Sequence, residues 1–327
     1  MHDFGFFLKT YGKDYDRAVR LIESFENYNV EALPLYLACP QSDIKQFTTL
    51  ERRNIKIIPE EEICTNVFIE DAKWTAGYLN QEIYKLAFWE MGLCANYMCI
   101  DSDAIFIRPF YLKDFMYDEK TPYTSLEEDN DLCSDCYYNK LYWNGRLEWI
   151  KKIEDEIDFH PYHLLSCHGF QIFSGKVLKS LKSDFMGPKR YTYKKLIEIA
   201  PYEFSWYNLW LQKTEIIPIH PIGYLFKTFH LKQHHIFYVL HGMRVEDWAK
   251  GYIGIIVNSN YEVGEGDYYD LSIYNGNNTD LPDDVIRMNY KFYKRLMKDR
   301  NYRLPLKYIG KIKNRIQGAI INVRKGK

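Results

Sequence analysis

The stretch 98-MCIDSDAIFIRP-109 decides the fold, because a short apolar run there delivers two carboxylates, Asp101 and Asp103, separated by one small residue. In an extended chain residues i and i+2 point the same way, so both carboxylates are expected to face one site. Two anions held so close repel each other unless a cation lies between them. Mg²⁺ or Mn²⁺ is the expected cation, since these ions take carboxylates together with substrate phosphates. An isolated D-x-D is more often a solvated turn or a helix cap, but its place directly after an apolar strand favours a metal site.

Upstream of this stretch, apolar runs alternate with segments of helical periodicity. The apolar runs predict strands over 4–8, 33–38, 55–58 and 97–100, and the helical spacing predicts helices over 14–27, 42–53 and 74–91. Such alternation predicts βαβ units and a largely parallel sheet covered on both faces. Ligands of such sheets collect at the carboxyl ends of the strands, which here are residues 9–12 and 101–103.

Downstream of residue 110 the pattern is less regular. It predicts helices over 141–157, 177–181, 194–199 and 205–211, and strands over 169–173, 216–219 and 252–257. Residues 262–281 are rich in Gly, Asn and Asp, which predicts an exposed loop. The composition turns basic near residue 282, so we divide the chain into a body, 1–281, and a basic tail, 282–327.

The tail has a charge opposite to that of the body. Of the 43 Lys and Arg residues, 13 lie in 291–327 with a single acid, Asp299, so residues 1–290, with a net charge near −13, precede residues 291–327, with a net charge near +12. Within 304–323 the apolar residues form one helical stripe: Ile309, Ile312, Ile316, Ala319, Ile320 and Val323. A basic amphipathic helix of this kind predicts binding to an anionic membrane surface. The alternative is that this helix docks on the chain's own acidic body. A nucleic-acid partner is not expected, because the body of the chain is acidic.

The cysteines and the first residues indicate the compartment. Seven cysteines are scattered through the chain, an odd number that predicts free thiols in a reducing environment. Cys133 and Cys136 form a C-x-x-C without the second pair that a zinc site needs. The start, MHDFGFF, lacks the basic and apolar regions of a signal peptide, and no apolar stretch approaches the length of a membrane span. We expect a cytoplasmic protein, attached peripherally to the inner face of the membrane.

The chain resembles the GT-A glycosyltransferases and, more narrowly, a poorly characterised bacterial glycosyltransferase-like family tied to surface polysaccharides. Four stretches within about residues 5–212 carry the likeness. They are Leu8-Lys9-Thr10-Tyr11 with Asp14 and Arg17, Gly77-Tyr78 with Gln81 and Lys85-Leu86, Asp101-Ser102-Asp103 with Arg108-Pro109, and Phe204-Ser205 with Tyr207.

The resemblance implies an α/β GT-A fold with a nucleotide-binding half, about 1–110, and an acceptor half, about 111–281. It implies a metal-dependent enzyme that moves a sugar from a nucleotide-diphosphate sugar, most often a UDP-sugar, to a glycan or lipid-linked acceptor. Mn²⁺ or Mg²⁺ is the implied cofactor. One alternative is a nucleotide-sugar-binding protein without transferase activity. Another is a metal-dependent nucleotidyltransferase or phosphohydrolase, although a nucleotidyltransferase would prefer a glycine-rich loop where this chain has Lys-Thr-Tyr-Gly.

The same resemblance implies roles for individual residues. The implied donor-binding residues are Lys9, Thr10, Tyr11, Gln81, Lys85 and Ser102. Gln81 and Lys85 lie four apart on one helical face, where Lys85 is expected to neutralise phosphate or orient Asp101. Asp101 is expected to touch the ribose or the metal and to take part in catalysis, and Asp103 to ligate the metal. The alternative for Tyr11 is packing at a strand end, and for Gln81 and Lys85 a solvated helix face.

The likeness breaks near residue 205. Relatives tend to carry acids where this chain has Trp206 and Asn208. An inverting transferase needs a carboxylate to accept the proton of the acceptor hydroxyl, and the nearest acid is Glu203. Glu203 is therefore the candidate base, and the alternative is a surface acid at a helix start.

Histidines supply the remaining candidates. Five of the nine fall within 22 residues: His220, His230, His234, His235 and His241. Many GT-A enzymes complete the metal shell with a late histidine, and we prefer His230, with His234 second. His168, which precedes a predicted strand, is a candidate for holding donor or acceptor sugar. The alternative for each is a packing or surface residue.

Overall fold

The computed structural model describes residues 2–70, 75–126, 144–162, 169–229, 238 and 243–257. The predicted loop 262–281 and basic tail 282–327 lie outside these ranges, as does the Cys133/Cys136 pair. The division of the chain into a body and a tail therefore stays a prediction.

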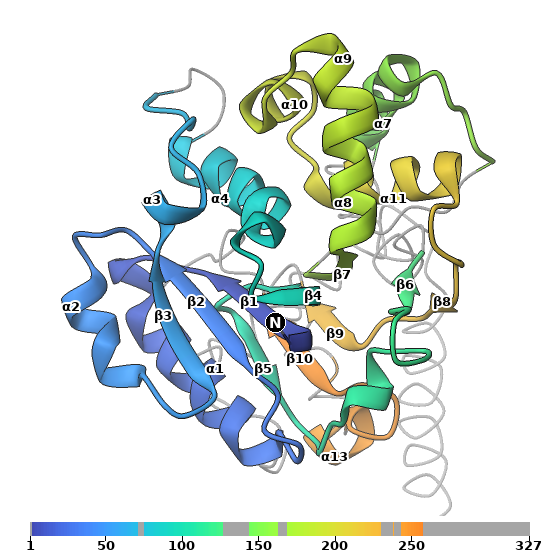
Figure 1. Cartoon of the computed structure of the whole chain (residues 1–327). Coiled ribbons are helices and arrows are strands. Elements are labelled where there is room, and N and C mark those ends of the chain that lie inside the picture. The colour runs from blue at the N-terminus through green and yellow to red at the C-terminus, as the bar shows by residue number, and fades with distance from the viewer. Residues whose placement is uncertain are drawn as a thin grey trace, which may run out of the picture.

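A five-stranded, mostly parallel sheet forms the centre of a mixed α/β fold (Figure 1). Its order is β3 (Ile55–Pro59), β2 (Leu35–Cys39), β1 (His2–Lys9), β4 (Cys94–Ile100) and β7 (Phe170–Ser174). The first four strands run parallel, and β7 is antiparallel to β4. The strands predicted over 4–8, 33–38, 55–58, 97–100 and 169–173 are all confirmed.

The strand order reverses direction between β1 and β4. From β1 the chain adds β2 and β3 on one side, and then returns to add β4 on the other side, with Leu8 opposite Ile100. The loops that follow β1 and β4 therefore leave the sheet side by side at a topological switch point. In open α/β sheets this is where ligands bind, outside the carboxyl ends of the strands.

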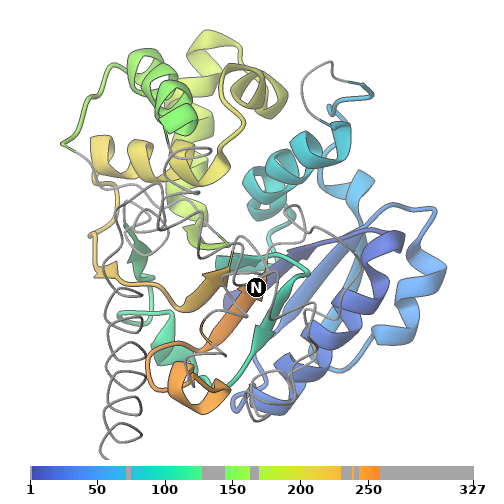
Figure 2. The same ribbon diagram turned by 180° about the vertical axis from the view of Figure 1, so that it is seen from behind.

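Each face of the sheet is covered by helices (Figures 1 and 2). Phe6 and Leu8 of β1 pack in the same apolar cluster as α1 (Tyr15–Tyr28), whereas Phe7 packs with α4 (Ala76–Ala87). Burial on both faces explains why the parallel strands are nearly continuous apolar runs in the sequence. The other α-helices with bounds in the described ranges are α2 (Ile44–Phe47), α3 (Glu60–Ile63), α7 (Asn144–Ile157), α8 (Gly175–Ser180), α9 (Gly187–Lys189), α10 (Tyr193–Ile199), α11 (Glu203–Thr214) and α13 (Val245–Trp248).

Two predicted helices are shorter in the structure. The helix predicted over 42–53 is α2 followed by a 3₁₀ turn at Thr48–Leu50, where the hydroxyls of Thr48 and Thr49 donate to the carbonyls three residues earlier. Such back-bonding competes with regular helix geometry. In the helix predicted over 74–91, α4 passes into a 3₁₀ turn that ends at Gly92, which adopts a left-handed conformation (φ 64°).

The strand predicted over 216–219 is wrong. The chain there is irregular, and the short β8 (Pro221–Ile222) forms instead, paired with β6 (Thr124–Ser125). Pro218 lies inside the predicted strand and has no N–H to give to a ladder, which explains the difference.

A second sheet begins directly after the D-x-D segment. It consists of β5 (Ala104–Phe106), β10 (Gly254–Val257) and β9 (Phe226–Phe229), in that order. Gly254 is required at this position because a Cβ there would lie 2.1 Å from the ring of Phe226. Residues 101–103 therefore form the link between the two sheets.

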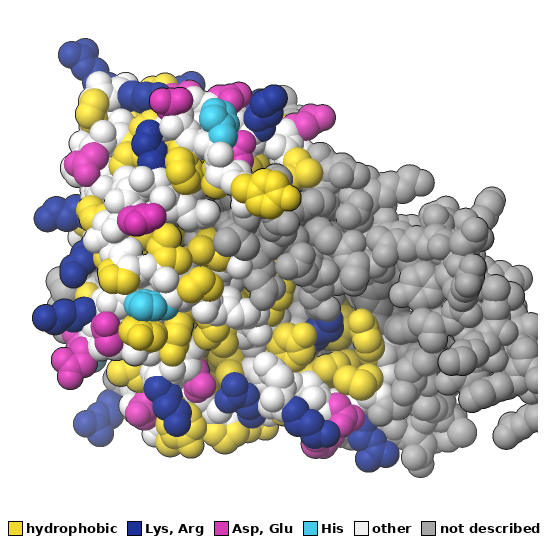
Figure 3. Space-filling view, turned by 90° about the vertical axis from the view of Figure 1, so that its right-hand side faces the viewer, with side chains coloured by type: hydrophobic (Ala, Val, Ile, Leu, Met, Phe, Trp, Pro, Cys, Tyr) yellow, Lys and Arg dark blue, Asp and Glu magenta, His cyan; other side chains and the backbone are white. Residues whose placement is uncertain are grey.

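On the face shown in Figure 3, basic and acidic side chains of the described residues are interspersed, and neither sign gathers into one patch. Four cysteines lie in the described ranges, and all four are free: Cys39, Cys64, Cys94 and Cys99. No helix in the described part of the chain is long and apolar enough to cross a membrane.

Candidate active site

Residues 101–103 form a turn at the carboxyl end of β4. The amide of Ala104 donates to the carbonyl of Asp101 at 3.1 Å, and the amide of Val257 donates to the carbonyl of Asp103 at 3.2 Å. The prediction that residues 101–103 are extended, from which we expected the two carboxylates to face one way, is therefore wrong. Both acids still belong to one turn at the switch point, where Asp101 is partly exposed and Asp103 is buried.

One oxygen of Asp101 is held from α4. Gln81 donates to Asp101 Oδ1 through Nε2 at 2.9 Å, and Lys85 Nζ lies 3.1 Å from the same oxygen. The spacing of four residues thus brings Gln81 and Lys85 together at the motif. The other oxygen, Oδ2, has no hydrogen-bond partner among the described residues, and 31% of the side chain is exposed. The carboxylate is fixed on one side and open on the other.

Lys85 also contacts Glu203, the first residue of α11. Its Nζ lies 3.0 Å from Glu203 Oε1, and both side chains are buried. Neither residue is therefore part of a solvated surface. A buried ammonium requires nearby anions to offset the loss of hydration, and Lys85 has two.

A third buried acid, Glu82, adjoins Glu203. Burial, and then the neighbouring Glu203, raise the pKa of Glu82 well above its ordinary value of 4.5. Burial alone would also raise the pKa of Glu203, but the ammonium of Lys85 and the hydrogen bond from Glu82 outweigh burial and lower it. The pKa values of the two buried carboxyls therefore shift in opposite directions, which favours the neutral form of Glu82 and the charged form of Glu203. Sequence reasoning missed Glu82, although an acid on the buried side of an apolar helix was a usable signal.

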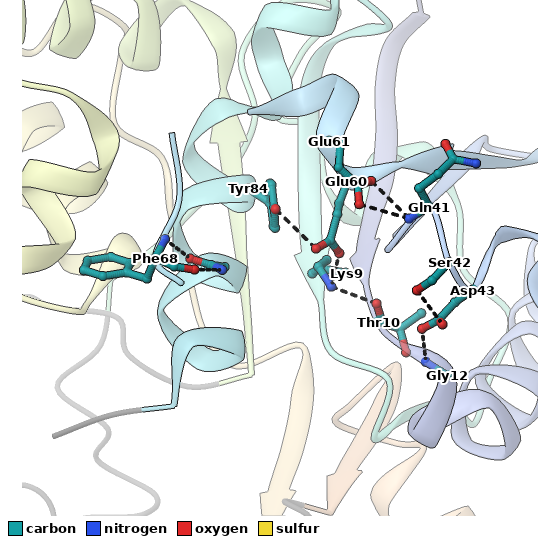
Figure 4. A network of polar contacts seen from close by, with 11 residues as sticks. Lys9, Thr10, Gly12, Gln41, Ser42, Asp43, Glu60, Glu61, Phe68 and Tyr84 are labelled. Atoms are coloured by element: carbon teal, nitrogen blue, oxygen red, sulfur yellow. Dashed lines mark hydrogen bonds and ion pairs between the residues drawn. The ribbon is translucent and has the colours of Figure 1, made fainter. Parts of the chain in front are cut away.

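A second polar network fixes the loop after β1 (Figure 4). Lys9 Nζ lies 2.5 Å from Glu60 Oε2 and donates to the carbonyl of Thr10 at 2.8 Å. The hydroxyl of Tyr84 donates to Glu60 Oε1 at 3.2 Å. Lys9 thus ties its own loop to the end of β3. Glu60 was not identified from the sequence, although it follows the third strand directly, as Asp101 follows the fourth.

The loop continues with one buried and one exposed residue. Thr10 is buried, whereas Tyr11 is 45% exposed. The amide of Gly12 donates to Asp43 Oδ2 at 2.7 Å, which joins this loop to the segment after β2 (Figure 4). The segments that follow β1, β2 and β3 are therefore tied together by these contacts.

The residues at which the chain departs from its resemblance are structural. Trp206 and Asn208 are fully buried. Trp206 donates through Nε1 to the carbonyl of Ala200 at 3.0 Å, and Asn208 Oδ1 accepts from Gln171 Nε2 at 2.9 Å. An acid at either position would be enclosed by the core.

The histidine candidates mostly lie outside the described residues. These include His168, His230 and His234. His220 is described, and its ring stacks on Tyr117 with 3.5 Å between centroids. Within the described ranges no three His, Cys, Asp or Glu residues form a group that could hold a metal.

Comparisons with known proteins give limited matches. The model of a family of unknown function, DUF6492, matches residues 7–132, which include the β1 loop, Gln81, Lys85 and the D-x-D turn. No curated protein matches. Among solved structures, the apo form of mouse xyloside xylosyltransferase 1 is similar to 80% of this chain over 100% of its own length, with 11% identity and a TM-score of 0.47.

Proposed function

We propose that this chain is a metal-dependent glycosyltransferase of the GT-A type, which moves a sugar from a nucleotide-diphosphate sugar to a glycan or lipid-linked acceptor. The observation that carries the proposal is the state of Asp101. This carboxylate stands at the switch point between β1 and β4, with Oδ1 held by Gln81 and Lys85 and Oδ2 open. A fixed, partly exposed carboxylate at this place suits the binding of a charged ligand.

The donor set fits a hard divalent cation. Asp101 and Asp103 offer carboxylate oxygens from one turn, the ligand type that Mg²⁺ and Mn²⁺ prefer. His230 is the proposed third ligand from the protein. A bound ion would offset the negative charge that develops on the leaving diphosphate.

The loop after β1 is the proposed site for the nucleotide. The exposed ring of Tyr11 offers a face on which a base can stack, and UDP is the first nucleotide to test. Lys9 supports this loop through Glu60 and the carbonyl of Thr10, so we assign it the task of holding the loop. Thr10 and Ser102 border the same switch point, and a sugar contact from His168 remains part of the proposal.

Asp101 remains the proposed catalytic carboxylate. The side chain of Glu203 is only 7% exposed and is engaged by Lys85, so it offers little surface to an acceptor hydroxyl. We therefore give Glu203 a positioning role in place of the general base first considered for it.

Thermal denaturation with UDP, GDP and CDP, each with and without Mn²⁺, tests the proposal. A ligand at about 100 times its Kd stabilises a protein by about 2.7 kcal/mol, which is a shift of several degrees for a chain of this size. We expect that shift only when nucleotide and Mn²⁺ are present together, and Asp103→Ala should abolish it. Asp155→Ala, a change of an exposed acid on α7, is the matched control. A shift that needs no metal would contradict the proposal.

The products from UDP-glucose separate the transferase from the alternatives. A transferase breaks the bond between sugar and diphosphate, so it releases UDP even when water is the acceptor. A phosphohydrolase breaks the pyrophosphate and releases UMP with glucose 1-phosphate. ³¹P NMR distinguishes the two, and release of UMP would favour the phosphohydrolase. Metal-dependent binding without turnover on any donor would favour a binding protein.

The basic tail completes the proposal. We assign it to an anionic membrane surface on the cytoplasmic side, where a lipid-linked acceptor would be available, because 13 of its residues in 291–327 are basic. The full chain should co-sediment with phosphatidylserine-containing liposomes. Undiminished binding after deletion of 304–327 would refute this assignment.

A further inference from the structure

One buried ammonium serves two carboxylates at the candidate active site. Lys85 Nζ lies 3.1 Å from Asp101 and 3.0 Å from Glu203, and its side chain is 3% exposed. If Lys85 had Asp101 as its sole partner, the pair would be neutral. A divalent cation would then compete with the lysine for that carboxylate. The second carboxylate changes this balance.

The position of Glu203 favours its charged form. It is the first residue of α11, where the positive end of the helix dipole stabilises an anion. Its Oε1 contacts Lys85, which provides the counter-charge that a buried carboxylate needs. Glu203 is therefore the anion that balances Lys85.

Glu82 is placed to stay neutral. It lies within α4, away from a helix N-terminus, and its Oε2 has no hydrogen-bond partner among the described residues. Burial and the neighbouring carboxylate of Glu203 raise the pKa of Glu82, so its neutral form is favoured beside the charged Glu203. Glu82 thus adjoins Glu203 without adding a second negative charge.

We propose that Glu203, held by the neutral acid Glu82, neutralises Lys85 and so leaves the negative charge of Asp101 available for a divalent cation. Lys85 then orients Asp101 without competing for its charge. Glu203 and Glu82 are positioning residues that act through Lys85. This inference rests on the proposed function, in which Asp101 is a metal ligand.

Mn²⁺ binding to the full chain tests the proposal, measured from the electron paramagnetic resonance signal of free Mn²⁺ in the presence of UDP. Residues that support metal ligands typically change metal affinity by about 10-fold to 100-fold when replaced. We expect Glu203→Gln to weaken Mn²⁺ binding by about 10-fold or more. Asp155→Asn is the matched control, because it removes the charge of an exposed acid on α7 outside this cluster, and its affinity should stay near that of the unaltered chain. Glu82→Gln keeps the size and the neutrality of Glu82, so any loss of affinity should be smaller than that of Glu203→Gln.

A double variant tests whether Glu203 acts through Lys85. In Lys85→Met/Glu203→Gln both charges are gone, so Asp101 again carries its charge alone. We expect the Mn²⁺ affinity to recover relative to Glu203→Gln. If Glu203→Gln fails to fold, Glu203→Asp provides a second comparison, since it keeps the charge and should keep most of the affinity.

The outcomes separate the two proposals. If the unaltered chain binds no Mn²⁺, or if Asp101→Asn binds it equally well, the proposed metal site fails and this inference fails with it. If Asp101→Asn loses binding while Glu203→Gln keeps it, only the role of Glu203 is overturned. A loss in Glu82→Gln as large as that in Glu203→Gln would also overturn it, because the pair would then be a structural contact alone.

Discussion

Two lysines stand at the same edge of the central sheet, Lys85 buried and Lys9 partly buried, and the carboxylates that balance their charges differ. Lys9 has one carboxylate partner, Glu60, together with the carbonyl of its neighbour Thr10. Lys85 has two carboxylate partners, Asp101 and Glu203. Both lysines connect to α4, since Tyr84 contacts Glu60 and the next residue is Lys85 itself.

From this difference we infer which network supports the fold and which one we propose to bind a ligand. Lys9 and Glu60 form one pair of opposite charges whose side chains are 9% and 14% exposed, so the pair fixes the β1 loop and is neutral in itself. The Lys85 network has an excess acid, and its most exposed member is Asp101. An unbalanced negative charge on Asp101, the most exposed member of this network, favours the binding of a cation from solution.

The largest expected effect is on stability, and it comes from removing Lys85. Lys85→Met leaves Glu203 buried without its counter-charge, which typically costs about 3–5 kcal/mol. Lys9→Met should lower the free energy of unfolding by less, about 1.5–3 kcal/mol, because the Lys9–Glu60 pair is more exposed than the Lys85–Glu203 pair. Urea denaturation of the two variants gives both free energies of unfolding. Equal losses would remove the distinction between the two networks.

Sequence alone predicted the first half of the fold well. The strands before residue 101 were found because parallel strands buried on both faces are short apolar runs. Gln81 and Lys85 were paired because residues four apart share a helix face. Both inferences use local periodicity, which a single sequence displays directly.

Sequence could not predict the partners that complete the site. Lys85 and Glu203 lie 118 positions apart, and the register that joins them is set by the packing of α11 against α4. The position of Glu82 on the buried side of an apolar helix was a usable signal, but nothing local indicates that its neighbour is Glu203. The turn at 101–103 was also misjudged as extended, because the second sheet that draws Val257 onto Asp103 is formed by residues about 150 positions away.

The effect expected next in size is on the pH dependence of stability, and it comes from the proton on Glu82. The pKa of Glu82 in the folded chain lies above 4.5, so folding favours its protonated form. Its contribution to stability is therefore complete below 4.5 and is lost as the pH rises through the folded-state value. Glutamine at position 82 has no proton to lose. Between pH 4.5 and the folded-state pKa of Glu82, the free energy of unfolding of Glu82→Gln should therefore rise relative to that of the unaltered chain by about 1.4 kcal/mol per pH unit.

Urea denaturation of both proteins near pH 4, pH 5.5 and pH 7 measures this difference. Glu203, whose pKa is lowered, contributes with the opposite sign and is present in both proteins. A difference that does not grow with pH would show that Glu82 is ionised in the folded chain. The balance proposed around Lys85 would then be incorrect.

The smallest effect belongs to the outer member of the Lys9 network. Tyr84→Phe removes the hydrogen bond to Glu60 and nothing else, which should cost about 0.5–1.5 kcal/mol. Tyr97→Phe is the matched variant on the other network, since the Tyr97 hydroxyl donates to the backbone carbonyl of Lys85 at 2.7 Å in a fully buried position. It should cost more, because the carbonyl left behind has no access to water.

The Tyr84→Phe variant also separates the two networks by their effect on metal binding. If the Lys9 network only holds the loop, Tyr84→Phe should leave the Mn²⁺ affinity unchanged. A loss of Mn²⁺ affinity as large as that of Glu203→Gln would mean that the two networks act as one.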